Sequence, residues 1–341
     1  MNSFSIELNL RQRGFSLVEM MIAITIGFII VGAIGYLYLG SRQSFRTTDA
    51  MSRIQENARY ALQTMAHDVR MAGYVGCGNV SNMRVTTIAN GAPTMNATNA
   101  LNGIDSGTAA ANYGGIARPA GDVIQVFAAF GGGVNLTGNL LPSNANAQVA
   151  GNPYGFKQGD VLTVTNCINA DVFKVTNNPG SSGLVTLTYG SGSNSSNRVS
   201  GTYGADAFVM KTDQYTYFIG NNNNPNGGRS LYRSSLNDGT VELADNVWDM
   251  QVVYGYDTNG VGTADTYYTA ASVPAWTNVV SARISLLMVS ADNVLSGAQT
   301  YQYFSDAATA PGAVTPAAAA VDRLRLHQVF TTTVGLRNRL P

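Results

Sequence analysis

The clearest pattern in the chain is an apolar run over residues 20–39, followed by a stretch in which apolar residues recur at three- and four-residue steps. A run of about 20 residues makes about 30 Å of helix, which is enough to cross the hydrocarbon core of a bilayer. The recurring residues form one stripe of an amphipathic helix; they are Met51, Ile54, Ala58, Ala61, Leu62, Met65, Val69 and Ala72. No proline interrupts residues 15–72, so we expect one continuous helix with Gly73 as its C-cap.

Beyond residue 73 the pattern changes to short alternating or β-branched runs bounded by turn residues, which is typical of strands. The expected strands are residues 121–130, 159–167, 170–176, 183–190, 206–211, 214–220, 229–235, 248–257, 279–290 and 324–334. Stretches rich in Gly, Asn, Ser, Thr and Ala predict surface loops, at residues 86–120, 135–152, 177–203 and 221–228, and an exposed linker at 309–320. The pattern predicts an α+β protein whose long helix crosses a membrane in its first half and packs on an antiparallel sheet in its second.

The composition narrows the class of protein. Charged residues make up 12% of the chain, about half the usual share, and small polar residues replace them. Lysine plus arginine equals aspartate plus glutamate at 20 each, so no basic excess indicates nucleic-acid binding. This balance favours an extracytoplasmic, β-rich protein over a helical cytosolic enzyme.

Residues for catalysis or cofactor binding are sparse. The histidines, His67 and His327, lie far apart in the sequence, and no zinc-protease, nucleophile-elbow or phosphate-loop motif occurs. We therefore expect a protein that is not an enzyme and has no resident cofactor. One loop offers a weak calcium candidate, because Asp257, Asn259 and Asp265 place oxygen ligands around two glycines, although their spacing differs from that of an EF-hand.

The residues before the apolar run carry a more specific signal. Arg11 and Arg13 precede Gly14 and Phe15, and Glu19 lies just before the apolar residues. A cleaved secretory signal peptide fits poorly because the run is long and lacks an A-x-A exit, and a plain membrane anchor does not explain Glu19. The arrangement resembles the signal of type IV pilins and related pseudopilins. The resemblance implies that a prepilin peptidase cuts between Gly14 and Phe15 and that Phe15 is then N-methylated.

The same resemblance gives Glu19 a role. After cleavage Glu19 is the fifth residue, the position at which the family has its glutamate. An unpaired carboxylate in hydrocarbon costs several kcal/mol. The family picture is that the glutamate pairs with the new terminal amine of a neighbouring subunit, so that the charge selects for assembly and register.

Two further segments resemble the PilW type of minor pilin. Arg70, Ala72 and Gly73, then Tyr74, Gly76 and Cys77, match a motif at the end of the long helix, and residues 331–339 resemble the family's C-terminal end. The implied organisation is a leader at 1–14, a transmembrane or filament-core helix at 15–40, an amphipathic helix at 41–73 and a β-rich head at 74–341. This is the pilin-like architecture.

The chain has two cysteines, Cys77 and Cys167. In an exported chain such a pair predicts one disulfide, and the alternative is two unrelated buried thiols. The bridge would close a loop of about 90 residues and stabilise the head by about 4–5 kcal/mol.

The resemblance implies a minor pilin that primes or caps type IV pilus assembly, supporting twitching motility and adhesion. The implied partners are a prepilin peptidase, other minor pilins, the major pilin, a large tip adhesin and the inner membrane. The implied location is the inner membrane with the head in the periplasm, then the pilus. Two alternatives stay open: a J-like minor pseudopilin of type II secretion, and an exported glycan-binding module on a pilin anchor. Trp248, Tyr254 and Tyr256 would serve the latter as a ligand surface, unless they pack in the core.

Overall fold

The computed structural model describes residues 16–78, 80–106, 112–119, 121–222, 228–304 and 309–339. The chain divides into two compact units, Met1–Asp49 and Ala50–Pro341, which we call the stalk and the head. Cys77 and Cys167, expected to be bridged, both lie in the head. Gly14 and Phe15, at the expected processing site, lie outside the described residues.

The long helix α1 runs over Leu17–Arg70, so it begins in the stalk and ends in the head. Its end is tightened, because the N–H groups of Met71 and Ala72 donate to carbonyls three residues back. Gly73 then has φ +74°, and its N–H donates to the carbonyl of Phe127 at 3.0 Å. The helix thus ends slightly before the expected residue 72, and Gly73 makes the turn that a left-handed conformation allows.

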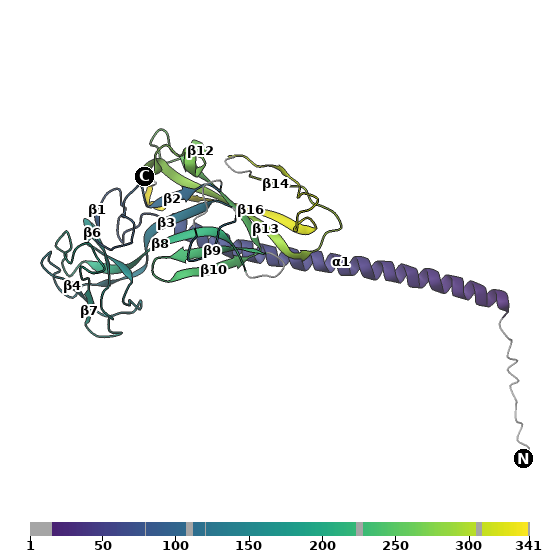
Figure 1. Cartoon of the computed structure of the whole chain (residues 1–341), viewed down its shortest axis with the longest axis horizontal. Coiled ribbons are helices and arrows are strands. Elements are labelled where there is room, and N and C mark those ends of the chain that lie inside the picture. Colours follow the sequence, from purple (N-terminus) through teal and green to yellow (C-terminus); the bar gives the residue numbers. More distant parts are fainter. Residues whose placement is uncertain are drawn as a thin grey trace, which may run out of the picture. The chain divides into compact units, whose positions relative to one another are not determined.

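The head contains one large sheet in the order β1-β6-β5-β8-β3-β2, with β9 added to β8 and β10 added to β9 (Figure 1). The strands are β1 (Arg84–Thr87), β2 (Leu101–Ile104), β3 (Val123–Asn135), β5 (Val161–Thr165), β6 (Asn169–Lys174), β8 (Phe208–Asn221), β9 (Arg229–Ser235) and β10 (Gly239–Asp245). Pairing is antiparallel except between β1 and β6.

A second sheet has the order β12-β11-β13-β16 and is antiparallel throughout. Its strands are β11 (Val247–Tyr256), β12 (Thr266–Tyr268), β13 (Val279–Asn293) and β16 (Arg325–Gly335). Two small sheets pair β4 (Asn146–Val149) with β7 (Val185–Thr188) and β14 (Tyr301–Tyr303) with β15 (Gly312–Val314). Three 3₁₀ turns complete the described elements: η1 (Ala270–Ser272), η2 (Trp276–Asn278) and η3 (Arg337–Arg339).

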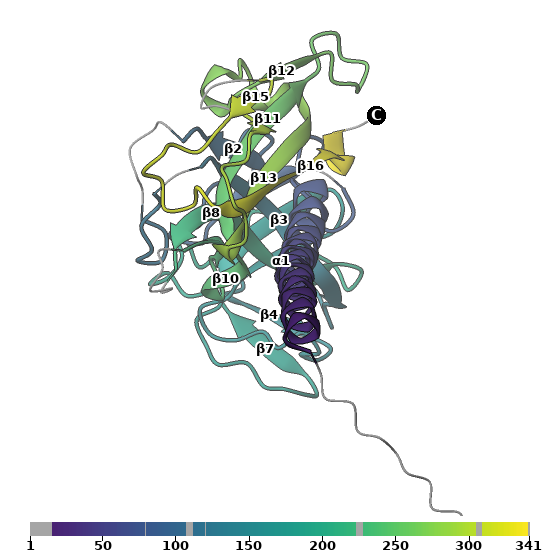
Figure 2. The same cartoon turned by 90° about the vertical axis from the view of Figure 1, so that its right-hand side faces the viewer.

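One core of buried apolar side chains joins the last turns of α1 to both main sheets. Figure 2 shows β11, β13 and β16 beside one another in the second of these sheets. The buried residues of α1 follow the expected stripe; they are Ile54, Ala58, Ala61, Met65, Asp68 and Val69. They pack with apolar residues such as Ile124 of β3, Val252 of β11 and Ile284 of β13. The α+β, pilin-like architecture expected from the sequence is therefore confirmed.

The predicted loops are only partly surface loops. A second core lies around β4, β5 and β7 and buries Leu140 and Tyr203, which belong to the predicted loops 135–152 and 177–203. Leu101, in the predicted loop 86–120, is fully buried on β2. The surface-loop prediction was wrong for these stretches, because isolated large residues among small polar ones are enough to anchor short strands.

Three strand predictions also need correction. Residues 206–211 and 214–220 form the single strand β8 and not two strands, β10 was missed, and β15 lies inside the predicted linker 309–320. The polar residues Thr212 and Asp213 in the middle of β8 suggested a turn. In the fold Thr212 shares a hydrogen bond with Thr163 and Asp213 accepts the N–H of Leu236 at 2.7 Å, so both are satisfied within the sheet.

Candidate assembly interface

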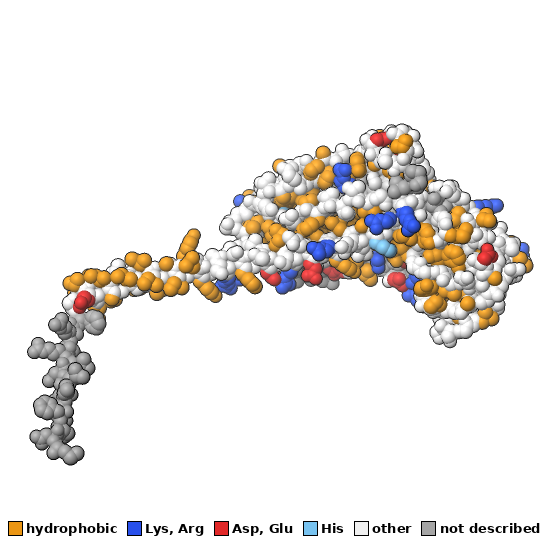
Figure 3. All heavy atoms as spheres, turned by 180° about the vertical axis from the view of Figure 1, so that it is seen from behind, with side chains coloured by type: hydrophobic (Ala, Val, Ile, Leu, Met, Phe, Trp, Pro, Cys, Tyr) orange, Lys and Arg blue, Asp and Glu red, His pale blue; other side chains and the backbone are white. Residues whose placement is uncertain are grey.

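Residues 17–39 of the stalk present an apolar surface on all sides. Large apolar side chains are exposed all along Leu17 to Leu39, and Phe28, for example, is 74% exposed. Among the described residues α1 is the helix that is long and apolar enough to cross a membrane, and this part of it is not buried. Figure 3 shows the apolar side chains covering this part of the helix. A surface of this kind requires a membrane or a packed protein environment.

The first turn of α1 is closed by a reciprocal pair of hydrogen bonds. The N–H of Ser16 donates to Glu19 Oε2 at 2.9 Å, and the N–H of Glu19 donates to Ser16 Oγ at 3.2 Å. This is a capping box, in which the serine is the N-cap and the glutamate lies three residues later. Its S-x-x-E signature was readable in the sequence and was missed. The structure thus gives Glu19 a local role besides any role in assembly.

Glu19 lies within one turn of the expected new terminus at Phe15. The N-terminal end of a helix carries partial positive charge, so it favours a carboxylate in its first turn. Because Glu19 is exposed, its carboxylate remains accessible to a neighbouring subunit while it caps its own helix. The pairing of Glu19 with an amine stays a prediction.

In the head, α1 is attached to the large sheet through Asp68. This carboxylate is buried, accepts the hydroxyl of Tyr217 on β8 and lies 3.6 Å from the guanidinium of Arg233 on β9. Arg233 also lies over the ring of Tyr215, at 4.4 Å from its centroid. His67 beside it is exposed, with Nδ1 3.0 Å from Asp68 Oδ1. Asp68 is a charged residue on the apolar stripe of α1, and this position in the sequence was the signal that could have revealed the network.

The disulfide between Cys77 and Cys167 ties the segment after α1 to the turn between β5 and β6. The bridge expected from the sequence is therefore present in the structure. Gly76, next to the bridge, has φ +102°, and a Cβ there would lie 2.7 Å from Thr165 and 2.8 Å from Phe208. Glycine is required at this position because a side chain would be strained and would clash.

The calcium candidate is a loop held by its own hydrogen bonds. Asp257 accepts the N–H groups of Gly260 and Gly262, both at 2.7 Å, and further N–H groups of the same loop. These bonds, with that of Gly262 first, hold the pKa of Asp257 below its ordinary value. Asp265 accepts the N–H and hydroxyl of Thr258, and Asn259 accepts the N–H of Val261. The three side chains shape the loop, and calcium binding there stays a prediction.

The aromatic residues suggested as a ligand surface do not gather on one. Tyr254 is fully buried and packs edge-on against Trp276, with centroids 4.7 Å apart. Tyr256 packs against Tyr268, and Trp248 is covered by the guanidinium of Arg229 at 4.8 Å. These contacts are packing contacts, which is the alternative that the sequence left open.

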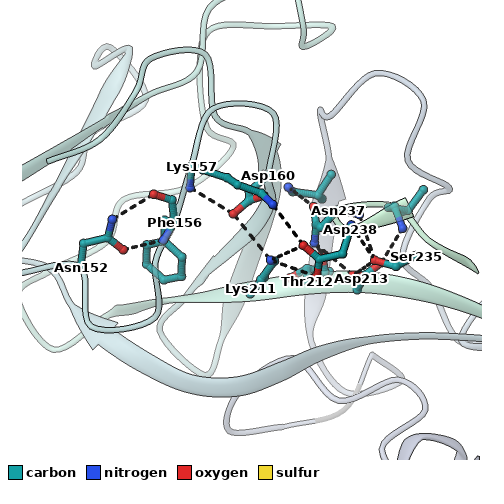
Figure 4. Close-up of polar contacts among 12 residues, drawn as sticks. Asn152, Phe156, Lys157, Asp160, Lys211, Thr212, Asp213, Ser235, Asn237 and Asp238 are labelled. Atoms are coloured by element: carbon teal, nitrogen blue, oxygen red, sulfur yellow. Dashed lines mark hydrogen bonds and ion pairs between the residues drawn. The ribbon is translucent and has the colours of Figure 1, made fainter. Parts of the chain in front are cut away.

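A group of charged residues lies where β8 meets the turn before β5 and the turn between β9 and β10 (Figure 4). Lys157 and Lys211 both donate to Asp238, at 3.2 and 3.3 Å. Partial burial would raise the pKa of Asp238, but the two lysines outweigh it and hold this pKa below its usual range. Burial raises the pKa of Asp160 and of Asp213. The group joins three chain segments, and within the described residues no set of three metal-ligating side chains occurs.

Two family models match parts of the chain. Residues 216–338, from β8 to η3, match the family model described as Type IV Pilus-assembly protein W, PilW. Residues 9–35 match the model described as the prokaryotic N-terminal methylation motif. The two matches lie in the head and at the stalk, and the second includes Gly14, Phe15 and Glu19.

A pilin-like protein, PilA3 of Thermus thermophilus, is 38% identical to the chain over 71 residues. That alignment covers 20% of this chain and 30% of the relative, so the chain spans less than a third of the length of that relative. No solved structure matches the chain. The families matched are those of pilus assembly, and no enzyme family is among them.

Proposed function

We propose that this chain, which belongs to the PilW family of type IV pilus-assembly proteins and carries the N-terminal methylation motif, is a minor pilin. In this proposal it primes or caps the pilus. The supporting observation is the pairing of an exposed apolar stalk with a head whose residues 216–338 match PilW. A subunit of this kind works by binding, through helix packing and contacts between heads. Twitching motility and adhesion would depend on it through the pilus.

The stalk suggests a two-stage path. A prepilin peptidase removes residues 1–14, and the new amine of Phe15 is methylated. The apolar helix, proposed as residues 15–40, holds the protein in the inner membrane with the amphipathic helix 41–73 and the head 74–341 in the periplasm. The same apolar surface then packs against other pilins when the subunit leaves the membrane, because filament core and bilayer are both apolar environments.

Glu19 supplies the selective step in this proposal. In the filament its carboxylate pairs with the terminal amine of a neighbouring Phe15, which removes the cost of placing either charge among apolar side chains. The proposed partners are other minor pilins, the major pilin and a large tip adhesin.

The experiment is deletion of the gene in the source bacterium, with surface pili and secreted proteins measured in the same cultures. Loss of pili with unchanged secretion supports the proposal. Unchanged pili with lost secretion would favour a J-like minor pseudopilin instead. Mass spectrometry of the mature chain should find Phe15, methylated, at its N-terminus, and any other first residue would reject the processing step.

A further inference from the structure

Two strand edges lie beside the later turns of α1, and they differ. On one side β10 pairs only with β9, and Asn57 of α1 donates to Asp245 of β10. This edge carries acidic residues, including Glu242, and an irregularity between Glu242 and Ala244. Charges and bulges are the usual means by which proteins keep an edge strand from pairing with another chain. The β10 edge is therefore protected.

The other edge is β16, which among the described residues pairs with β13 alone. Its residues 328–334 read Gln-Val-Phe-Thr-Thr-Thr-Val, without a charge or a proline, and their register with β13 is unbroken from His327 to Gly335. Such β-branched, uncharged edges favour the addition of a further strand. The β16 edge thus lacks the protection that β10 has.

The direction of the main-chain groups along β16 follows from its hydrogen bonds. The N–H of Leu336 donates to the carbonyl of Val280 on β13, so even-numbered residues direct their main-chain groups toward β13. His327 directs its groups outward, where its N–H donates to Gln299 Oε1 and its carbonyl accepts Gln299 Nε2, both at 3.0 Å. The side-chain amide of Gln299 therefore occupies the place of a neighbouring strand at one end of the edge.

By the same alternation, Val329, Thr331 and Thr333 direct N–H and C=O groups outward. Within the part of the chain that the structure describes, no residue donates to or accepts from these outward groups. They span about 13 Å of edge. A helix cannot satisfy them, because its own main-chain groups are bonded internally, whereas an extended strand pairs with all of them.

A groove of about 420 Å³ runs between this edge and α1. Its lining residues are Gln55, Arg59, Leu62, Gln63, Ala66, Phe330, Thr331 and Thr332. The apolar side chains of Leu62, Ala66 and Phe330 would face one side of an added strand. Arg59 is the charged residue of the lining, and it favours a carboxylate on the incoming chain.

We propose that the β16 edge and this groove receive an extended strand from a neighbouring pilus subunit, with small apolar residues facing α1 and a carboxylate opposite Arg59. This inference rests on the proposed function, since it names how that neighbour is held. The strand pairs with the outward groups of Val329, Thr331 and Thr333 and continues the four-stranded sheet beyond β16.

The test uses the full-length chain in cells that make pili, with a photo-crosslinking amino acid at Thr331 or, separately, at Thr333. Strand pairing predicts adducts on one extended segment of another pilus subunit, with the two attachment points two residues apart. Attachment points three or four residues apart would indicate a helix, and adducts to lipid alone, or none, would also overturn the proposal.

A proline variant sharpens the test. Thr331→Pro removes an outward N–H without removing a bond to β13, which edge strands tolerate. It should lower the adduct yield from position 333 by about tenfold or more. Thr331→Ala keeps the N–H and should leave the yield within about twofold. An unchanged yield for a folded Thr331→Pro chain contradicts the proposal.

Amide exchange in the unaltered chain provides a measurement that does not depend on any variant. The amides of Thr331 and Thr333 should exchange rapidly in detergent-solubilised chain and become protected in pili. If they exchange equally fast in both, the strand is not added. If gene deletion abolishes pili but these amides stay unprotected in pili of the unaltered strain, the strand proposal fails and the proposed function stands. When deletion leaves pili intact, the proposed function fails.

Discussion

The stalk part and the head part of α1 have the same backbone conformation but differ in how their apolar residues are exposed. Over residues 17–39 of the stalk large apolar residues occupy every face and are exposed, whereas in the head they occupy one stripe that is buried against both sheets. The head part can therefore satisfy its apolar residues within its own chain, and the stalk part cannot. One helix thus serves both as a folding element and as a surface for assembly, and the change occurs where its residue pattern changes.

The largest effect that would sharpen this comparison is loss of the disulfide. Replacing Cys77 and Cys167 by alanine should lower the free energy of unfolding of the head by about 4–5 kcal/mol, because the bridge closes a loop of 90 residues. The two tryptophans, Trp248 and Trp276, both lie in the head, so their fluorescence follows its unfolding. Reduction of the unaltered chain should reproduce the loss, and membrane insertion of the stalk should not change. A loss below about 1 kcal/mol would contradict the chain-entropy argument.

The next effect is a dependence of head stability on pH. Burial raises the pKa of Asp122 to about 7, against the opposing N–H bonds from Val252 and Ser106. Between about pH 4 and pH 7 the folded chain then binds more protons than the unfolded chain, so stability falls as pH rises. We expect a loss of about 3–4 kcal/mol across this range, measured by urea unfolding at several pH values.

Asp122→Asn provides the control for that measurement. The amide does not titrate, so this part of the slope should vanish, although the variant is less stable at low pH because one N–H loses its acceptor. A slope that persists unchanged in Asp122→Asn would assign the effect to another group.

Arg233→Met tests how α1 is held in the head. The substitution leaves the buried carboxylate of Asp68 without its cation, and it should cost about 3 kcal/mol in the free energy of unfolding. Adding Asp68→Asn should recover part of the loss, since the uncompensated charge is then gone. If the single variant is as stable as the parent, Tyr217 and His67 satisfy Asp68 without Arg233.

A lysine placed in each part of the helix breaks the comparison directly. Ile29→Lys places a charge near the middle of the apolar run and should make the free energy of membrane insertion less favourable by about 2.5–3 kcal/mol, with head unfolding unchanged. Ile54→Lys places the same charge in the core and should destabilise the head with insertion unchanged. Alkaline extraction of membranes measures the first property and tryptophan fluorescence the second. An equal response of both properties to either lysine would show that the two parts are not independent.

The sequence predicted those elements whose residue pattern repeats over many residues. The helix, β3, β9, β11, β13 and β16 were found because periodic apolar residues extend over one or more turns or strand repeats. The short strands β4 and β15 were missed because four and three residues among small neighbours are too few to show a period. Thr212 and Asp213 divided β8 in the prediction, since their partners, Thr163 and Leu236, are distant in sequence.

The candidate interface was predictable to a similar degree. The offset between Phe15 and Glu19 pointed to the processing signal, and the family matches agree with it. The capping role of Ser16 was within reach of the sequence. The open edge of β16 was not, because it depends on which strand lies last in the sheet and on Gln299 meeting His327.

In the proposed function the charge of Glu19, and not its capping bond, drives entry into the pilus. Glu19→Gln keeps a side-chain oxygen that accepts the N–H of Ser16 and removes the charge, whereas Ser16→Ala removes the N-cap and keeps the charge. The measurement is the amount of each full-length variant in purified pili relative to its amount in the membrane. We expect Glu19→Gln to be lost from pili and Ser16→Ala to be incorporated, and normal incorporation of Glu19→Gln would show that the charge is not needed.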